Sequence, residues 1–341
     1  MSDEVGVLKR LLQNLALLAA GCLVAVLLVE TVVRICLPQE DIAEWFVAHD
    51  LYGVTLKRNF HQRYDYVGHD FTMHVQTNSL GFRDKEQDFS REREEKTILL
   101  LGNSFVFGYG INIPDRFDTR LESLLREHGQ PMHIVNAGVP SWGTRNETDY
   151  ARRHFSVIKP DVIVLLFCGN DPGDDRGLRR PALSGKNSIL YLPKRFLRMH
   201  THTYRFLLKQ MTIARHRQRV SKSLSRNAQA QLDVQSGSAI SASDWETTRT
   251  LIRGFYSDFK HFNKSGRLIV MAAAPDNEDV QKNLAMLANG KDLVYLDLSE
   301  AIADIPDEDR RTPWDGHWSP AMHAVAAKEI HSLLMKMDLL E

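Results

Sequence analysis

The part of the chain from residue 96 to residue 341 repeats one pattern, in which a short aliphatic run is followed by a turn and then by a segment with helical periodicity. The runs are rich in Ile, Leu and Val and lack strict polar–apolar alternation, which is typical of strands buried on both faces. Strands that alternate with helices join in parallel through right-handed crossovers. The pattern therefore predicts an α/β fold with a doubly wound parallel sheet. The predicted strands are residues 98–101, 133–135, 162–167, 268–273 and 293–298.

Local signals mark three of the intervening helices. Asp115 can cap a helix that runs to His128, and Gly129 can end it. Pro320 stands where a proline in the first turn would open the last helix. A third helix presents one apolar face, made of Leu251, Ile252, Phe255, Phe259 and Phe262.

The N-terminus carries a long apolar segment. The fifteen residues 15–29 have no charged or strongly polar side chain, and their apolar flanks extend the segment to 11–37. A helix of about 20 apolar residues is long enough to cross a bilayer. We therefore expect a single transmembrane anchor at 11–37. A cleaved signal peptide, a lipoprotein signal ending at Cys22 and a buried core helix are the alternatives.

The charges beside this segment predict its orientation. Lys9 and Arg10 precede it, and acidic residues follow it. Because positively charged flanks stay in the cytoplasm, residues 1–10 are predicted to be cytoplasmic and the rest of the chain to lie outside. Residues 38–95 show little periodicity apart from a strand-like run at 71–77, and we interpret them as a spacer and small cap.

A basic insertion interrupts the strand–helix alternation at about residues 176–243. Its first part, 176–226, holds fourteen Lys and Arg residues and no Asp or Glu. It is either a solvated helical insertion balanced by acids elsewhere or a contact for anionic lipid headgroups or an anionic polymer. The whole chain has a formal net charge of zero, and no recognition motif accompanies the basic residues. We therefore expect no nucleic-acid partner.

Polar residues follow the predicted strands where ligands bind in parallel sheets, at the carboxyl ends. Ser104 comes directly after the first strand and can expose its hydroxyl on a tight strand-to-helix turn. A serine needs a base to become a nucleophile, and His317, just before the last helix, can supply it. Asp315 can hold the imidazole in the correct tautomer, with Asp307 or Asp309 as the alternative orienting group.

A serine nucleophile also needs hydrogen-bond donors for the oxyanion that forms during acyl transfer. The candidates are the backbone N–H of Ser104, a backbone N–H of the loop after the second strand, and the side chain of Asn170 after the third. The three cysteines of the chain have no metal-ligand spacing, so we expect no metal site.

Four segments together resemble the four sequence blocks of the SGNH/GDSL hydrolase family. They are Gly-Asn-Ser-Phe at 102–105, Asn-Ala-Gly-Val-Pro-Ser-Trp-Gly at 136–143, Gly-Asn-Asp at 169–171 and Asp-Gly-His-Trp at 315–318. Each block is weak alone, but the four occur in the family's order. The segment 77–84 also resembles one that precedes the catalytic domain in tethered bacterial members.

The resemblance implies a five-stranded, flavodoxin-like parallel sheet for residues 96–341. It also implies cleavage or transfer of acyl groups, commonly acetyl groups on carbohydrates, without a metal or organic cofactor. With the anchor, it places the chain in a bacterial inner membrane with its catalytic domain on the periplasmic side.

Three positions depart from the family pattern. The usual Asp before the nucleophile is Asn103, and the oxyanion glycine is replaced by Ser141, with Gly143 as an alternative alignment. Asp315 and His317 are two residues apart, whereas many members use a spacing of three. The short spacing is shared with acetyltransferase relatives, so it does not separate an esterase from an acyltransferase.

Two functions follow as hypotheses. The first is a membrane-anchored serine esterase or O-acyltransferase that acts on O-acyl esters, above all acetyl esters of a glycan. The second is a non-catalytic scaffold or assembly subunit of a membrane complex that retains the fold. Trp142 and Trp318 could line an acyl or sugar pocket, although packing beside the loops is the favoured interpretation.

Overall fold

The computed structural model describes residues 2–39, 41–66, 71–89, 95–177, 191–220 and 240–337. The parts 178–190 and 221–239 of the basic insertion therefore lie outside the described residues. The chain divides into two compact units, one of residues 1–44 and 185–222 and the other of residues 45–184 and 223–341. The two units are described separately.

The larger unit is built on a five-stranded parallel sheet in the order β6-β5-β7-β8-β9. The strands are β5 (Thr97–Gly102), β6 (His133–Gly138), β7 (Val162–Phe167), β8 (Arg267–Ala272) and β9 (Leu293–Tyr295). Every residue of β5, β6 and β7 is buried, as their aliphatic composition predicts. The predicted doubly wound sheet is confirmed, although β9 ends three residues earlier than the apolar run.

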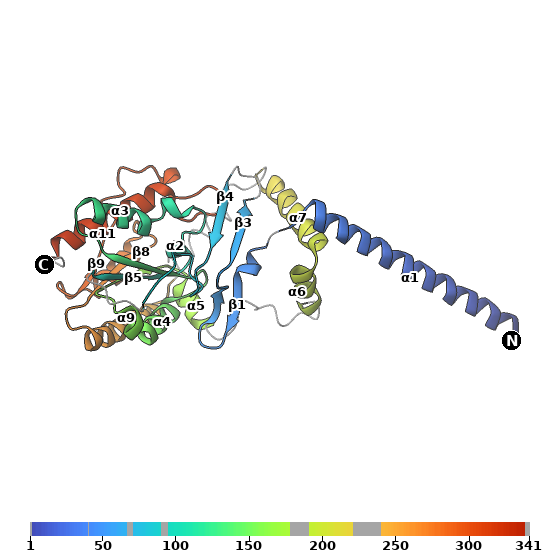
Figure 1. The fold of residues 1–341 in the computed structure, drawn as a ribbon, viewed down its shortest axis with the longest axis horizontal. Helices are drawn as coiled ribbons and strands as arrows, with labels where there is room; N and C mark the ends of the chain where they lie inside the picture. Colours follow the sequence, from blue (N-terminus) through green and yellow to red (C-terminus); the bar gives the residue numbers. More distant parts are fainter. Residues whose placement is uncertain are drawn as a thin grey trace. The chain divides into compact units, whose positions relative to one another are not determined.

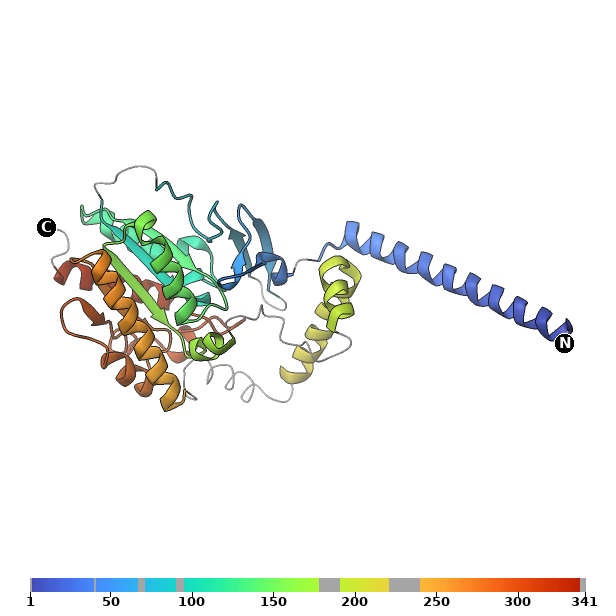
Figure 2. The same cartoon turned by 90° about the horizontal axis from the view of Figure 1, so that it is seen from below.

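Helices cover both faces of this sheet, and Figures 1 and 2 show the three layers. One face carries α3 (Phe117–Glu127) and α11 (Pro320–Lys336), which pack against each other. The other carries α4 (Thr144–Ile158) and α9 (Ala242–Phe262), which also lie side by side. Shorter helices follow β7 and β8. They are α5 (Asp171–Gly177) and α10 (Glu278–Ala285), with 3₁₀ turns at Ile113–Asp115 and Asp307–Asp309.

The start of α3 differs from the sequence prediction. Asp115 does not cap this helix, because it lies in the preceding 3₁₀ turn and Arg116 occupies the cap position without a side-chain hydrogen bond. Instead, the N–H of Phe117 donates to Nδ1 of His323 at 3.2 Å. His323 lies on α11, 206 residues away, and is 1% exposed. A long-range contact of this kind leaves no local signal in the sequence.

Two β-hairpins precede the sheet within the larger unit. The first pairs β1 (Phe46–His49) with β2 (Gly53–Leu56), and the second pairs β3 (His61–Asp65) with β4 (Thr72–Gln76). The strand predicted at 71–77 corresponds to β4.

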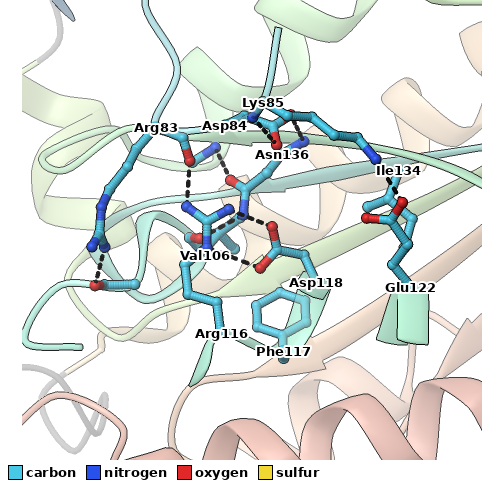
Figure 3. Close-up of polar contacts among 12 residues, drawn as sticks. Arg83, Asp84, Lys85, Val106, Arg116, Phe117, Asp118, Glu122, Ile134 and Asn136 are labelled. Carbon is cyan, nitrogen blue, oxygen red and sulfur yellow. Dashed lines mark hydrogen bonds and ion pairs between the residues drawn. The ribbon is translucent and has the colours of Figure 1, made fainter. Parts of the chain in front are cut away.

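A buried arginine joins the second hairpin to the helix that begins at Ser104. Arg83 is 1% exposed, and its guanidinium donates to the carbonyls of His74, Phe107, Gly108 and Ile111 at 2.7–3.2 Å. Figure 3 shows Arg83 beside a second network.

In that second network Arg116 donates to the carbonyl of Arg83 and forms a two-pronged ion pair with Asp118, at 2.9 and 2.5 Å. Asp84 accepts from the N–H of Asn136 at 3.0 Å, so this segment also reaches the second strand of the sheet. Segment 77–84 is therefore part of the framework that holds the first two loops of the site.

The smaller unit contains the helices α1 (Ser2–Cys36), α6 (Tyr191–His200) and α7 (His202–Val220). A 3₁₀ turn at Ile42–Trp45 follows α1 in the chain. Within the described part of the chain, residues 9–36 form the one helix that is long and apolar enough to cross a membrane, and its most apolar stretch is not buried by other residues. A signal sequence passes the same test, so the finding is compatible with both expectations.

Candidate active site

The nucleophile candidate begins a short helix at the carboxyl end of the central strand. Ser104 is the first residue of α2 (Ser104–Phe107), and the side chain of Asn103 caps the helix by accepting from the N–H of Phe105 at 3.2 Å. The helix packs directly on the second loop, because a Cβ at Gly138 would lie 2.2 Å from the backbone nitrogen of Phe107. A side chain at Gly138 would thus displace the helix that presents Ser104.

The structure brings Ser104 and His317 together across 213 residues of sequence. Nε2 of His317 lies 2.8 Å from Oγ of Ser104, which is hydrogen-bond distance. On the other side of the ring, Nδ1 lies 3.2 Å from Oδ1 of Asp315. The side chains of His317 and Asp315 are each 12% exposed, so the three residues form a continuous, largely buried line of contacts.

Asp315 is held in its ionised form. Burial would raise the pKa of this carboxyl, but hydrogen bonding and charge from His317, together with Thr312 and Tyr66, bring its pKa below the ordinary value. Thr312 donates its hydroxyl to Oδ1 at 2.5 Å. Of the alternative orienting groups, Asp307 pairs with Arg310 at 2.7 Å, whereas the carboxylate next to the imidazole is that of Asp315.

Aromatic rings enclose the imidazole and its carboxylate. The rings of Phe105 and Tyr109 lie with their centroids 4.9 Å from that of His317. Trp314, next to Asp315 in the chain, stacks on Phe71 of the second hairpin at 4.4 Å. The region interpreted from sequence as a spacer therefore contributes a wall of the site.

A glycine provides the room that Asp315 occupies. Gly110 has φ +82°, and a Cβ there would lie 2.6 Å from Oδ2 of Asp315. The left-handed backbone and the close carboxylate both require glycine at this position.

Asn170 lies beside Asn103, and its amide has a fixed orientation. Its Oδ1 is 3.4 Å from Nδ2 of Asn103, and its Nδ2 donates to Oδ2 of Asp174 at 2.5 Å. Burial raises the pKa of Asp174 to about 6. An amide nitrogen carries two protons, so the contact with Asp174 leaves one N–H of Asn170 for another acceptor.

Asn103 departs from the family aspartate for a reason visible in the structure. Its Nδ2 donates at 3.0 Å to Oδ1 of Asp171, which is fully buried. Burial, together with the charges of Asp174 and Asp175, raises the pKa of Asp171 well above its ordinary value. An amide at position 103 can donate to this carboxyl, whereas a carboxylate there would have no proton to donate.

The second loop presents two amides in different settings. Ser141 is exposed and adopts φ +70°, a left-handed conformation that favours glycine. Gly143 is buried, its N–H points to Oδ1 of Asn146 at 3.4 Å, and a Cβ there would lie 2.5 Å from the carboxylate of Asp175. Ser141 thus has the backbone conformation of a glycine, whereas Gly143 serves the start of α4.

The two tryptophans named from sequence are packing residues. Trp142 and Trp318 are each 1% exposed, and their indole N–H groups donate to the carbonyls of Val54 and Ala273, both at 2.8 Å. One side of the second loop also borders a groove of about 850 Å³. Its lining includes Tyr52, Arg58, Val139, Trp142, Arg153 and His154.

Sequence reasoning missed Tyr66, Tyr109, Thr312 and Asp174. None of them lies in a recognisable motif except Asp174, which follows the third block by three residues. Tyr66 reaches the site because the second hairpin folds against the sheet, whereas Tyr109 lies just beyond α2 and contacts His317 directly. Thr312, three residues before Asp315, is the one whose position in a loop next to a candidate carboxylate offered a local signal.

A serine, a histidine and a carboxylate in one line of contacts at the carboxyl edge of a parallel sheet define a serine-hydrolase type of site. The model of the GDSL-like lipase/acylhydrolase family matches residues 100–325, more than half of the chain. The chain therefore belongs to this family, which confirms the resemblance carried by the four blocks. Family membership supports an ester hydrolase.

Solved structures similar to this chain include a Clostridium thermocellum family 3 carbohydrate esterase, with 15% identity and a TM-score of 0.43 over 72% of this chain and 97% of that one. TesA has 10% identity and a TM-score of 0.44 over 71% of this chain and 99% of that one. A lipase/acylhydrolase from Enterococcus faecalis has 15% identity and a TM-score of 0.41 over 71% and 96%. Among curated proteins, none matches the chain.

Proposed function

We propose that the protein is a membrane-anchored serine esterase or O-acyltransferase, with Ser104 as nucleophile, His317 as general base and Asp315 as the group that orients the base. The observation that carries the proposal is the 2.8 Å contact between Nε2 of His317 and Oγ of Ser104, continued by the 3.2 Å contact to Asp315. This arrangement has the order and distances that an activated serine requires.

The reaction follows from these contacts. Oγ of Ser104 attacks the carbonyl carbon of the ester while its proton moves to Nε2 of His317. The resulting imidazolium is stabilised by Asp315, whose low pKa keeps it ionised. The bond to the alkoxy group then breaks as His317 returns the proton to the leaving alcohol, and an acyl ester of Ser104 forms. Water or a second alcohol, deprotonated by His317, releases the acyl group in the reverse sequence.

Three donors are proposed for the oxyanion. They are the N–H of Ser104 at the start of α2, the N–H of Ser141 and the side chain of Asn170. The left-handed conformation of Ser141 and its exposure support its amide over that of Gly143, which points to Asn146. Asp174 supports the role of Asn170 because it fixes the amide orientation at 2.5 Å. Removing one such donor costs about 10²–10³ in kcat.

We propose O-acyl esters of a glycan, above all acetyl esters, as the substrate class. The groove borders the second loop through Val139 and Trp142 and carries the aromatic Tyr52 and the cationic Arg58 and Arg153, whereas Ser104 and His317 are not among its lining residues. The proposed chemistry uses no metal or organic cofactor. Acetate release and acetyl transfer, measured side by side on acetylated and bare glycans, would separate the hydrolase from the transferase.

We propose that α1 stays attached and crosses the inner membrane of a bacterium once, with the catalytic unit on the periplasmic side. Side chains near the end of α1 support its retention. Glu30 accepts hydrogen bonds from the backbone of residues 202 and 203, and Arg34 donates to the carbonyl of His200. A segment destined for removal would have no need of such contacts with the mature chain.

A serine-reactive fluorophosphonate probe tests the enzyme against the scaffold hypothesis. We expect the purified protein to be labelled at Ser104 and the Ser104→Ala variant to remain unlabelled. A Ser104→Ala chain that fully complements a deletion strain would instead support the scaffold.

A further inference from the structure

The apolar helix α1 carries an ion pair near its carboxyl end. Glu30 and Arg34 lie one turn apart and pair at 3.0 Å. Among the positions 9–36, all side chains except those of Glu30 and Val33 are exposed, so one short face of the helix is covered. Charges in a membrane-spanning helix are costly unless they are paired and used. We therefore expect this ion pair to bind another part of the protein.

The covered face holds the turn between α6 and α7. The two carboxylate oxygens of Glu30 accept from the N–H groups of His202 and Thr203, at 2.8 and 2.9 Å. These residues begin α7, where the unpaired N–H groups and the helix dipole favour an anion. Arg34 donates to the carbonyl of His200, the last residue of α6, at 2.7 Å. The Glu30–Arg34 pair thus forms hydrogen bonds with backbone groups at the end of α6 and at the start of α7.

Acidic residues that follow α1 form ion pairs with arginines of the same two helices. Arg198 of α6 forms a two-pronged ion pair with Asp41 at 2.6 and 2.8 Å. Arg205 of α7 is 7% exposed, pairs with Glu44 and donates to the carbonyl of Gln39 at 3.0 Å. The attachment is therefore made on both helices, and part of the positive charge of the insertion is neutralised internally.

The rest of this surface is both apolar and basic. Among the exposed side chains of the described positions are the apolar Phe196 (61%), Leu197 (39%), Leu207 (53%) and Met211 (47%) and the cationic Lys194 and Lys209, beside Pro193, Arg198, His200 and Gln210. Leu207 and Met211 lie one turn apart on α7. Apolar side chains alternating with lysines on short helices are typical of segments that lie in the headgroup region of an anionic membrane.

We propose that residues 191–211 form a membrane-surface collar around the end of α1, with the exposed apolar side chains in the interface and the lysines on anionic phospholipid headgroups. The collar rests on the anchor part of the proposed function. Glu30 lies six residues before Cys36, about 9 Å along the helix axis. The α6–α7 turn is therefore held at the depth where the span leaves the hydrocarbon. The exposed apolar side chains favour a lipid surface over a soluble anionic polymer.

Depth-dependent fluorescence on the full chain in nanodiscs tests the collar. A polarity-sensitive dye is attached to Leu207→Cys in a background in which the exposed Cys22 and Cys36 are replaced by Ala. The matched control is the same dye on Val157→Cys, an exposed position of the larger unit. In nanodiscs with phosphatidylglycerol we expect quenching by spin-labelled lipid to be several-fold stronger at position 207 than at position 157. Equal quenching at the two positions would overturn the collar.

Further variants test the charges and the attachment. Lys194→Gln with Lys209→Gln should shift the docking equilibrium on phosphatidylglycerol on the order of tenfold toward the undocked state. Glu30→Ala combined with Asp41→Ala and Glu44→Ala removes the acidic attachments and should strongly reduce the lipid quenching at position 207 while the chain stays in the membrane. Full quenching in this triple variant, or protection of position 207 by a soluble polyuronate but not by phosphatidylglycerol, would contradict the proposal.

The collar and the enzyme fail in distinguishable ways. Intact mass measured on the same nanodiscs reports whether α1 is retained, and its loss would overturn both anchor and collar. Fluorophosphonate labelling of Ser104 on the same samples reports the enzyme alone, because the labelled serine belongs to the other unit.

Discussion

Replacing Arg83 by methionine probes how the segment before the sheet supports the nucleophile. The guanidinium is 1% exposed and makes five hydrogen bonds to four backbone carbonyls. Two of these carbonyls, of Phe107 and Gly108, lie at the end of the helix that begins at Ser104.

Two effects oppose each other in this substitution. Burial and the nearby charge of Arg116 lower the pKa of Arg83 to about 9, so the cation is held at a cost that methionine would remove. Against this, all four carbonyls lose the guanidinium. Those of Phe107 and Gly108 keep a long hydrogen bond, from Arg116 at 3.5 Å and from the N–H of Ile111 at 3.4 Å, whereas those of His74 and Ile111 have no other donor among the described residues. Each unsatisfied buried group costs about 1–3 kcal/mol. Because methionine fills the space without replacing any hydrogen bond, the loss outweighs the gain. We expect a net destabilisation of about 3–5 kcal/mol.

Thermal unfolding of the purified full chain measures this effect. A loss of about 3–5 kcal/mol should lower Tm by about 10 °C in a unit of this size. Arg83→Lys should rescue little, since an ammonium cannot span the four carbonyls. The control is Arg63→Met on β3, where the side chain is 62% exposed and should contribute less than about 1 kcal/mol. An Arg83→Met protein that melts within 2 °C of the wild type would refute the reasoning.

Three further predictions concern the site and its surroundings. Asp174→Ala should lower kcat about tenfold on an aryl acetate with little change in Tm, because Asn170 loses its fixed orientation; an unchanged kcat would contradict this. Ser141→Gly should keep activity and Ser141→Val should lose it, as expected for a backbone donor at φ +70°; the reverse order of kcat/KM would speak against the amide. Burial lowers the pKa of His323 from 6.5 to about 3. Below about pH 6.5 the imidazole takes up a proton in the unfolded chain but not in the folded one, so the free energy of unfolding falls as the pH falls toward 3. The total loss is at most about 5 kcal/mol. Denaturant titrations should show this slope in the difference between wild type and His323→Gln; parallel curves for the two proteins would exclude it.

The sheet and the residues at its edge were predictable because their signals are local. Aliphatic runs without alternation predict strands buried on both faces, and β5 to β8 follow them closely. Ser104, Asn170 and His317 each stand in a short block at the end of a predicted element. Topology then brings strand ends to one edge, and the predicted proximity of Ser104 and His317 needs no further information.

The supporting residues could not be predicted because their contacts span long distances in sequence. His323 closes α3 from 206 residues away, and Arg83 reaches Ile111 from a region without periodicity. The expected cap at Asp115 was wrong for the same reason, since a remote side chain satisfied the helix end. Glu30 and Arg34 have the sequence positions of ordinary residues at the end of a membrane span, and only the structure shows that Glu30 contacts α7 and Arg34 contacts α6.

Identification of the acyl-enzyme tests most directly whether Ser104 is the nucleophile. The purified full chain is reacted with an activated acetyl ester, quenched in acid after a few turnovers, digested and analysed by mass spectrometry. If Ser104 is the nucleophile, the peptide that contains it carries an acetyl group of +42 Da, the mass of C2H2O. We expect this adduct to be absent in Ser104→Ala. In His317→Gln the adduct should form far more slowly, because Oγ has lost its base. Acetylation at another residue, or equal acetylation of wild type and Ser104→Ala, would contradict the central claim.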